Sequence, residues 1–77
     1  MVKVSCVEAK DDYLLLVKLS NGKKGYFDVK PYLDKGIFRE LKDKSLFNSV
    51  RPAFGGVQWP HEQDLSADTI EFEMKPV

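Results

Sequence analysis

The sequence predicts a small α+β fold: a three-stranded antiparallel meander followed by short helical turns, one or two further short strands and a C-terminal helical turn. Three strand-like segments separated by turn residues come first, and Pro and Gly then interrupt the pattern in the middle of the chain. A helix-like start follows Asp64. With 77 residues the chain has material for only one core, so we expect a single domain over residues 1–77.

The first two strands are predicted over residues 2–9 and 13–20. In the first, Val4 and Cys6 fall on the same face because alternate residues share a face, so we expect Cys6 to be a small buried apolar group. The second strand is apolar on both faces in its first half, which indicates a central strand.

Asn21 and Gly22 separate the second strand from a third strand predicted over residues 24–29. Asn-Gly between two apolar runs is typical of a type I′ hairpin turn, whose two central residues both need a positive φ. The three strands therefore form an antiparallel meander.

The middle of the chain reads as short helical turns. Asp28 is a candidate cap for one turn that ends at Leu33, since Pro31 has no N–H to donate to a central strand. Residues 36–50 then show helical spacing in two pieces, and Asp43 or Ser45 can cap the second. The apolar residues of the two pieces are Ile37, Phe38 and Leu41, then Leu46, Phe47 and Val50.

Residues 51–59 look extended, with Gly55-Gly56 as a turn or bulge between two short strands. Phe54, Val57 and Trp59 are predicted to be buried there. The tail leaves two alternatives, because Ile70, Phe72 and Met74 alternate as in a strand while Asp64 or Ser66 can cap a helix over residues 66–73. We favour the helix.

Composition and charge limit the classes of function. Net charge is zero, but residues 1–51 carry eleven Lys and Arg against seven Asp and Glu, whereas residues 52–77 carry one against five. Since acids interleave with the lysines, we expect the two halves to fold against each other. Without excess positive charge, the electrostatic attraction to nucleic-acid phosphates is small.

Localisation follows from apolar runs and cysteine content. The longest apolar run, Tyr13–Val17, is far shorter than the about twenty residues that cross a membrane, and residues 1–12 lack the apolar segment of a signal peptide. The one cysteine, Cys6, permits no intramolecular disulfide, which suits a reducing compartment. We expect a cytoplasmic protein with no membrane contact.

Three segments together resemble a known family. They are YLLLVKLSNGKKGYFDVKPYL, GIFRELKDKSLFNSV and VQWPHEQDLSADTI, and in order and spacing they are similar to the small bacterial domain-of-unknown-function family 2442. The resemblance implies an α+β fold, no established activity and, as a conjecture, membership of a two-gene pair of the toxin–antitoxin kind. This chain has His61-Glu62-Gln63 where the family usually has Gly or Asn after Trp-Pro.

The stretch around His61 is the first candidate for chemistry, because Glu62 and Asp64 lie close to it in sequence. No nucleophile accompanies them: Ser66 lacks a nucleophile-elbow sequence, and Cys6 lies in a predicted strand. One His and one Cys do not make a zinc site, and no glycine-rich phosphate loop is present. We therefore expect no catalytic, cofactor-binding or metal-binding residues and interpret His61 as a solvated turn residue.

Trp59 allows two interpretations. It either closes the core with its indole N–H bonded to a nearby carbonyl, which we favour, or forms an aromatic ledge with Tyr26 or Tyr32 for a partner. Asp64 is read as a cap that fixes the Trp-Pro corner. The candidate interaction surface comprises Tyr26, Tyr32, Trp59, His61 and Asp64.

The predicted function is a non-enzymatic interaction module that binds a protein partner or forms a homodimer, and that acts as the regulatory or antitoxin-like member of a two-gene pair. One alternative is a nucleic-acid-associated regulatory domain that uses Lys18, Lys23, Lys24, Lys42 and Lys44. The other is a small hydrolase or metal-dependent enzyme centred on His61. No cofactor is expected.

Overall fold

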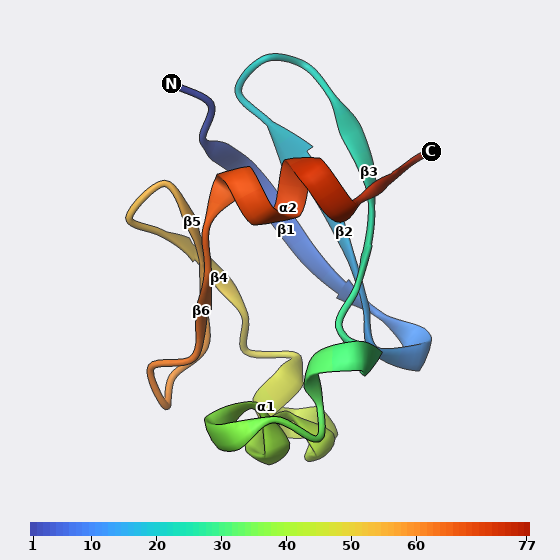
Figure 1. Cartoon of the computed structure of the whole chain (residues 1–77), viewed down its shortest axis with the longest axis vertical. Coiled ribbons are helices and arrows are strands. Elements are labelled where there is room, and N and C mark those ends of the chain that lie inside the picture. Colours follow the sequence, from blue (N-terminus) through green and yellow to red (C-terminus); the bar gives the residue numbers. More distant parts are fainter.

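The computed structural model describes residues 1–77 and has two antiparallel sheets, a layer of short helical turns and a C-terminal helix (Figure 1). The first sheet has the order β1-β2-β3-β7, with β1 (Val4–Lys10), β2 (Leu14–Leu19), β3 (Lys24–Asp28) and β7 (Lys75–Pro76). The second has the order β4-β5-β6, with β4 (Arg51–Ala53), β5 (Gly56–Gln58) and β6 (Asp64–Leu65). The predicted α+β fold and its opening meander are confirmed.

In the first sheet β2 is central, as predicted. Leu15, Val17 and Leu19 point to the core and are at most 1% exposed. The register between β1 and β2 shifts between Val4 and Cys6, so a bulge turns the rest of β1 over by one residue. Cys6 is therefore exposed, and the prediction that it is buried was wrong.

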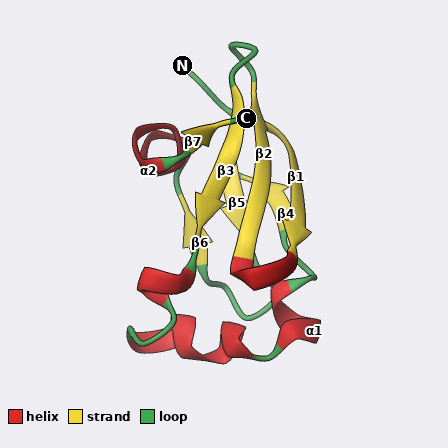
Figure 2. Cartoon of the chain, turned by 90° about the vertical axis from the view of Figure 1, so that its right-hand side faces the viewer, coloured by secondary structure: helices red, strands yellow, loops and turns green.

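The bulge and the strand alternation divide the first sheet into two faces. One face packs on the core, and the other has no helix or sheet in front of it in Figure 2. We call the second the outer sheet face; it carries Cys6, Glu8, Lys10, Leu14, Leu16, Lys18, Lys24, Tyr26, Asp28 and Lys75.

The hairpin between β2 and β3 differs from the predicted type I′ turn. Gly22 N donates to Leu19 O (3.0 Å) and Leu19 N donates to Lys23 O (2.8 Å), which defines a three-residue loop. Only Gly22 has a positive φ, at 90°, and it supplies the left-handed position that this loop needs.

Three short helical segments at one end of the molecule join the sheets: 3₁₀ helices η2 (Lys30–Tyr32) and η3 (Gly36–Lys42), and α1 (Lys44–Phe47). Asp43 caps α1 by accepting a hydrogen bond from Ser45 N (2.9 Å), as predicted. Asp28 accepts one from Lys30 N (2.9 Å), but the residue at the cap of η2 is Val29, so the predicted capping role of Asp28 was wrong. Ile37 is 55% exposed, so its predicted place on the apolar stripe was wrong. It lies in a tight 3₁₀ helix, which does not keep the 3.6-residue period.

Another 3₁₀ turn, η1 (Asp11–Tyr13), connects β1 to β2 and ties the sheet to the helical layer. The Tyr13 hydroxyl donates to the carbonyl of Lys42. Its ring meets Phe47 edge-on, with centroids 5.1 Å apart. The Tyr13 side chain therefore links the first sheet to the helical layer, as does the stacking of Tyr32 on Phe27.

The tail forms α2 (Ala67–Glu73), so the favoured helical reading is confirmed. Ser66 is the cap, and its hydroxyl accepts from Thr69 N (3.2 Å). The predicted capping role of Asp64 was wrong, because Asp64 lies in β6 and pairs with Gln58. After α2 the chain returns to the first sheet as β7, where a β-carbon at Gly25 would collide with the carbonyl oxygen of Lys75.

The core lies between the two sheets, α2 and the helical layer, and its largest member is Trp59, which is 0% exposed. Fourteen buried residues from all of these elements form one cluster. The structure contains no helix that is long and apolar enough to cross a membrane.

Candidate functional site

Trp59 occupies the centre of the core rather than a surface ledge. Its indole N–H donates to the carbonyl of Phe47 (2.9 Å), and its ring stacks on Phe47 with centroids 6.1 Å apart and meets Phe38 edge-on at 6.3 Å. The core-closing interpretation is confirmed. In this conformation Trp59 cannot contribute to a contact surface.

The other four candidate residues lie on separate parts of the surface. Tyr26 lies on the outer sheet face and is 38% exposed. Tyr32 lies in the helical layer and donates to both carboxylate oxygens of Glu73 (2.9 Å each); burial and that hydrogen bond raise the pKa of Tyr32. His61 and Asp64 are exposed near the β5–β6 turn. An interaction role for these four residues stays a prediction, but they do not form one surface.

The β5–β6 turn keeps the tight geometry of a hairpin despite its unusual sequence. Glu62 N donates to Trp59 O (3.0 Å) and Trp59 N donates to Gln63 O (2.9 Å), the same pattern as in the Gly22 loop. Glu62 occupies the left-handed position with a φ of 74°. The glycine that this position favours is absent, yet the turn is made.

His61 and Gln63 connect this turn to the helical layer through Glu40. His61 Nδ1 lies 3.3 Å from Glu40 Oε2, whereas Gln63 Nε2 donates to Glu40 Oε1 (3.1 Å) and to the carbonyl of Ile37 (2.8 Å). Gln63 is 0% exposed and its Oε1 has no hydrogen-bond partner. Sequence reasoning gave the acidic partner of His61 as Glu62 or Asp64, but the contact comes from Glu40, a residue distant in sequence.

No group of three His, Cys, Asp or Glu side chains is arranged to hold a metal ion. The lysines considered for nucleic-acid binding do not gather on one surface either. Lys23 pairs with Glu71 (3.3 Å) and Lys42 with Asp34 (2.8 Å). The remaining three divide between the outer sheet face, which carries Lys18 and Lys24, and the start of α1, which is Lys44.

Phe54 is a further residue whose position differs from the prediction. Ala53 pairs with Gly56, so Phe54 and Gly55 form a two-residue hairpin loop with φ values of 51° and 85°, as a type I′ turn requires. The turn geometry predicted for Asn21-Gly22 thus occurs here. Because Phe54 stands at the tip of this loop, its side chain is 96% exposed, and the prediction that it is buried was wrong.

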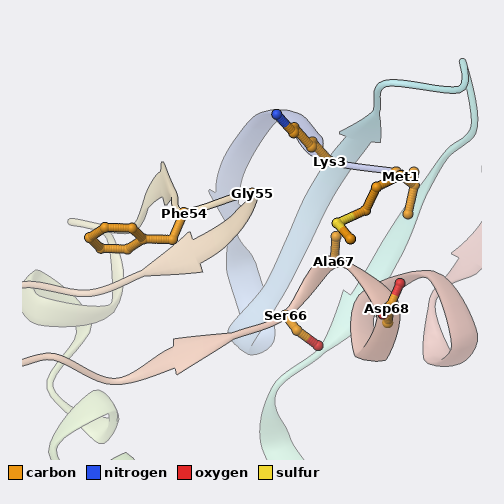
Figure 3. A pocket seen from close by; sticks show the side chains of 8 residues that line it. Met1, Lys3, Phe54, Gly55, Ser66, Ala67 and Asp68 are labelled. Carbon is orange, nitrogen blue, oxygen red and sulfur yellow. The ribbon is translucent and has the colours of Figure 1, made fainter.

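Three shallow hollows border Phe54. Figure 3 shows the hollow that also borders the N-terminus, where the Phe54 ring projects away from Met1 and Ala67. This hollow has a volume of about 360 Å³ and is also lined by Lys3, Ser66 and Asp68. The others measure about 580 Å³, beside Arg51 and Pro60, and about 150 Å³, beside Asp64 and Leu65. The ring is thus a ridge between hollows rather than the wall of an enclosed pocket.

The fold and these surfaces define a small α+β protein of two antiparallel sheets with an exposed aromatic hairpin. The chain belongs to the family described as "Protein of unknown function (DUF2442)", whose model matches residues 4–76. The resemblance seen in the sequence is therefore confirmed, and the match spans both sheets, the helical layer and α2. Neither the curated proteins nor the solved structures gave a match.

Proposed function

We propose that the chain is a non-enzymatic protein-interaction module and that the Phe54 hairpin is its anchor. The observation that carries the proposal is an aromatic side chain, 96% exposed, on a backbone with a φ of 51°. A left-handed conformation costs a residue with a β-carbon about 1–2 kcal/mol. Gly or Asn would avoid most of that cost, so this position carries a Phe ring at the expense of backbone strain.

The hairpin is built to bind without reordering. Register with β5 fixes both ends of the two-residue loop, and Val4 N donates to Gly55 O (2.7 Å), which ties the loop to β1. An anchor that is already ordered loses little conformational entropy on binding. Burying the Phe54 ring in a partner would contribute about 1.5–3 kcal/mol, the range for a large apolar side chain.

The surroundings of Phe54 match those of an interface anchor. Lys3, Arg51 and Asp68 border the adjacent hollows and supply a polar rim around an apolar centre. The two-gene arrangement implied by the family resemblance would supply the partner as a small co-encoded protein. The exposed thiol of Cys6 supports placing both proteins in a reducing cytoplasm.

Co-expression with the product of the neighbouring gene tests the proposal. We expect co-purification of the two proteins, and Phe54→Asn should weaken binding at least about tenfold, the loss of about 1.4 kcal/mol. Phe72→Asn is the matched control, because Phe72 is 89% exposed but lines none of the hollows that border Phe54. Unchanged binding by Phe54→Asn, or a chain that stays monomeric with no partner, would overturn the proposal.

Two further measurements separate this function from its alternatives. His61→Ala should leave binding unchanged, since His61 contacts Glu40 rather than the Phe54 hairpin. A gel shift with duplex and single-stranded nucleic acid at low salt should show no complex. A salt-dependent shift would favour the nucleic-acid alternative instead.

A further inference from the structure

We propose that the outer sheet face is a second docking surface, and that its occupant is an acidic amphipathic helix of a partner protein. In Figure 2, β2 and β3 face the viewer with no element in front of them, whereas β4 and β5 lie behind. The Phe54 hairpin joins β4 to β5, so it belongs to the other side of the molecule. This proposal goes beyond the function proposed above and does not depend on it.

The centre of the outer sheet face is apolar where a solvated face is ordinarily polar. Leu16 on β2 stands directly opposite Tyr26 on β3, and Leu14 lies two residues before Leu16 on the same face. Both leucines are partly exposed, and Tyr26 is 38% exposed. Three adjacent apolar side chains form a contiguous patch, the kind of feature that marks an interaction site.

The rim of that patch carries an excess of unpaired positive charge. The two acids on the face already have partners, since Glu8 binds Lys10 (2.8 Å) and Asp28 binds Lys30 (3.1 Å). The face's other lysines, Lys18, Lys24 and Lys75, are in no ion pair. An occupant with carboxylates at the edge of an apolar stripe would complement both the patch and this charge.

A protein segment fits the face better than a nucleic acid. Single-stranded nucleic acids need several aromatic rings on which bases stack, and this face has one ring, Tyr26, beside two leucines. Sheets of α+β proteins bury an apolar face under helices, but in Figure 2 α2 lies beside the β7 edge of this sheet and no helix lies over the outer sheet face. A shallow hollow of about 270 Å³, lined in part by Leu16, Lys18 and Lys24, gives a side chain of the helix a place to insert.

Amide chemical-shift mapping of the full chain tests the inference. The probe is a synthetic helical peptide of about 16 residues, long enough to form a helix, with Leu on one face and Glu on the other. We expect saturable shifts in β1, β2 and β3, and at least about a tenfold weaker affinity for Lys18→Glu/Lys24→Glu, because rim charges set partner choice. A peptide with Lys in place of Glu should not bind the wild type and should bind the double variant.

Matched variants keep the test informative if one of them folds poorly. Leu16→Ser should lose binding, whereas Ile37→Ser, an exposed residue of the helical layer, should keep it. Lys35→Glu/Lys44→Glu changes the net charge by the same amount as Lys18→Glu/Lys24→Glu, but away from the outer sheet face, so this variant should also keep peptide binding. Four outcomes would each overturn the inference. They are chemical shifts centred on the Phe54 hairpin, equal binding of the Glu and Lys peptides, no binding of the Glu peptide, and binding of a single-stranded RNA decamer instead of the Glu peptide. Loss of Phe54-dependent partner binding alone leaves it intact.

Discussion

Phe54 and Trp59 lie on either side of the short strand β5, and both were predicted to be buried, but the structure gives them opposite environments. Trp59 is 0% exposed, with its N–H bonded to Phe47 O, whereas Phe54 is 96% exposed at a positive φ. The first residue satisfies every requirement of a core side chain. The second satisfies none and occupies a costly backbone conformation. The contrast separates a residue that stabilises the fold from one available for contact.

The hairpin loops repeat the contrast. The loop at Gly22 uses a residue that tolerates its φ of 90°, and Glu71 holds it in place through Asn21 (2.9 Å) and Lys23 (3.3 Å). The loop at Phe54 uses a residue that disfavours its φ, and nothing covers its side chain. Strain at an exposed residue is typical of functional positions, because the surrounding structure must hold it there.

Trp59→Ala should have the largest effect on stability. It removes the centre of the aromatic cluster and leaves the carbonyl of Phe47 without its donor, so we expect a loss of about 4 kcal/mol in the free energy of unfolding. Urea denaturation measures it. Trp59→Phe is the control: it keeps most of the packing and loses only the hydrogen bond, at about 1–2 kcal/mol. A loss below about 1 kcal/mol for Trp59→Ala would contradict the assignment of Trp59 to the core.

Gln63→Glu should have the next largest effect. The side chain keeps its shape but loses the amide that donates to Ile37 and Glu40, and a carboxylate would lie buried beside the Glu40 carboxylate. We expect a loss of about 3 kcal/mol at neutral pH.

Acid titration checks the cause of that loss. Burial and the Glu40 charge raise the folded-state pKa of the introduced carboxyl above its unfolded value of about 4.3. The variant should therefore be most stable below that pH and lose stability as pH rises. Gln63→Met, which lacks the charge, should show no such trend. A pH-independent loss in Gln63→Glu would exclude the carboxylate as its cause.

Part of the fold could be predicted from the sequence, and part could not. The α+β class, the meander, α2 and the burial of Trp59 followed from periodicity and turn residues. The position of Cys6 did not, because a bulge in β1 reverses the alternation on which the prediction rested. Phe54 was misplaced because its hydrophobicity indicated burial, whereas the register of β4 with β5 decides its exposure. The contact of His61 with Glu40 joins distant segments, and only the tertiary fold brings them together.

Glu62→Gly separates backbone strain from the function of a side chain. Glu62 has a φ of 74°. Like Phe54, it makes no side-chain hydrogen bond or ion pair that would offset the strain of this conformation. Glycine removes a cost of about 1–2 kcal/mol but adds unfolded-state entropy worth about 0.5–1 kcal/mol, so we expect a net gain of about 0.5–1 kcal/mol. Phe54→Gly should give a similar gain in thermal stability.

The two variants should differ in partner binding. Glu62→Gly should bind the co-expressed partner as the wild type does, while Phe54→Gly should not. If both variants gain stability and both keep binding, the strain at Phe54 has no connection with function. If Glu62→Gly is destabilised, the left-handed assignment of that turn is wrong.

Glu71→Gln should produce the smallest effect, and only at neutral pH. The hydrogen bond from Asn21, and then the hydrogen bond and charge of Lys23, hold the pKa of Glu71 below its usual value. A lowered folded-state pKa stabilises the fold above the unfolded pKa of about 4.3, and this contribution disappears as pH falls through the lowered value. Gln still accepts from Asn21 but carries no charge, so urea midpoints of variant and wild type should differ at neutral pH and converge in acid. Asn21→Ala should bring the pKa of Glu71 back toward its usual value and so shift the acid limb of the curve of urea midpoint against pH. If the acid limbs of Asn21→Ala and the wild type coincide, Asn21 does not hold Glu71, and the side-chain tether of the Gly22 loop is absent.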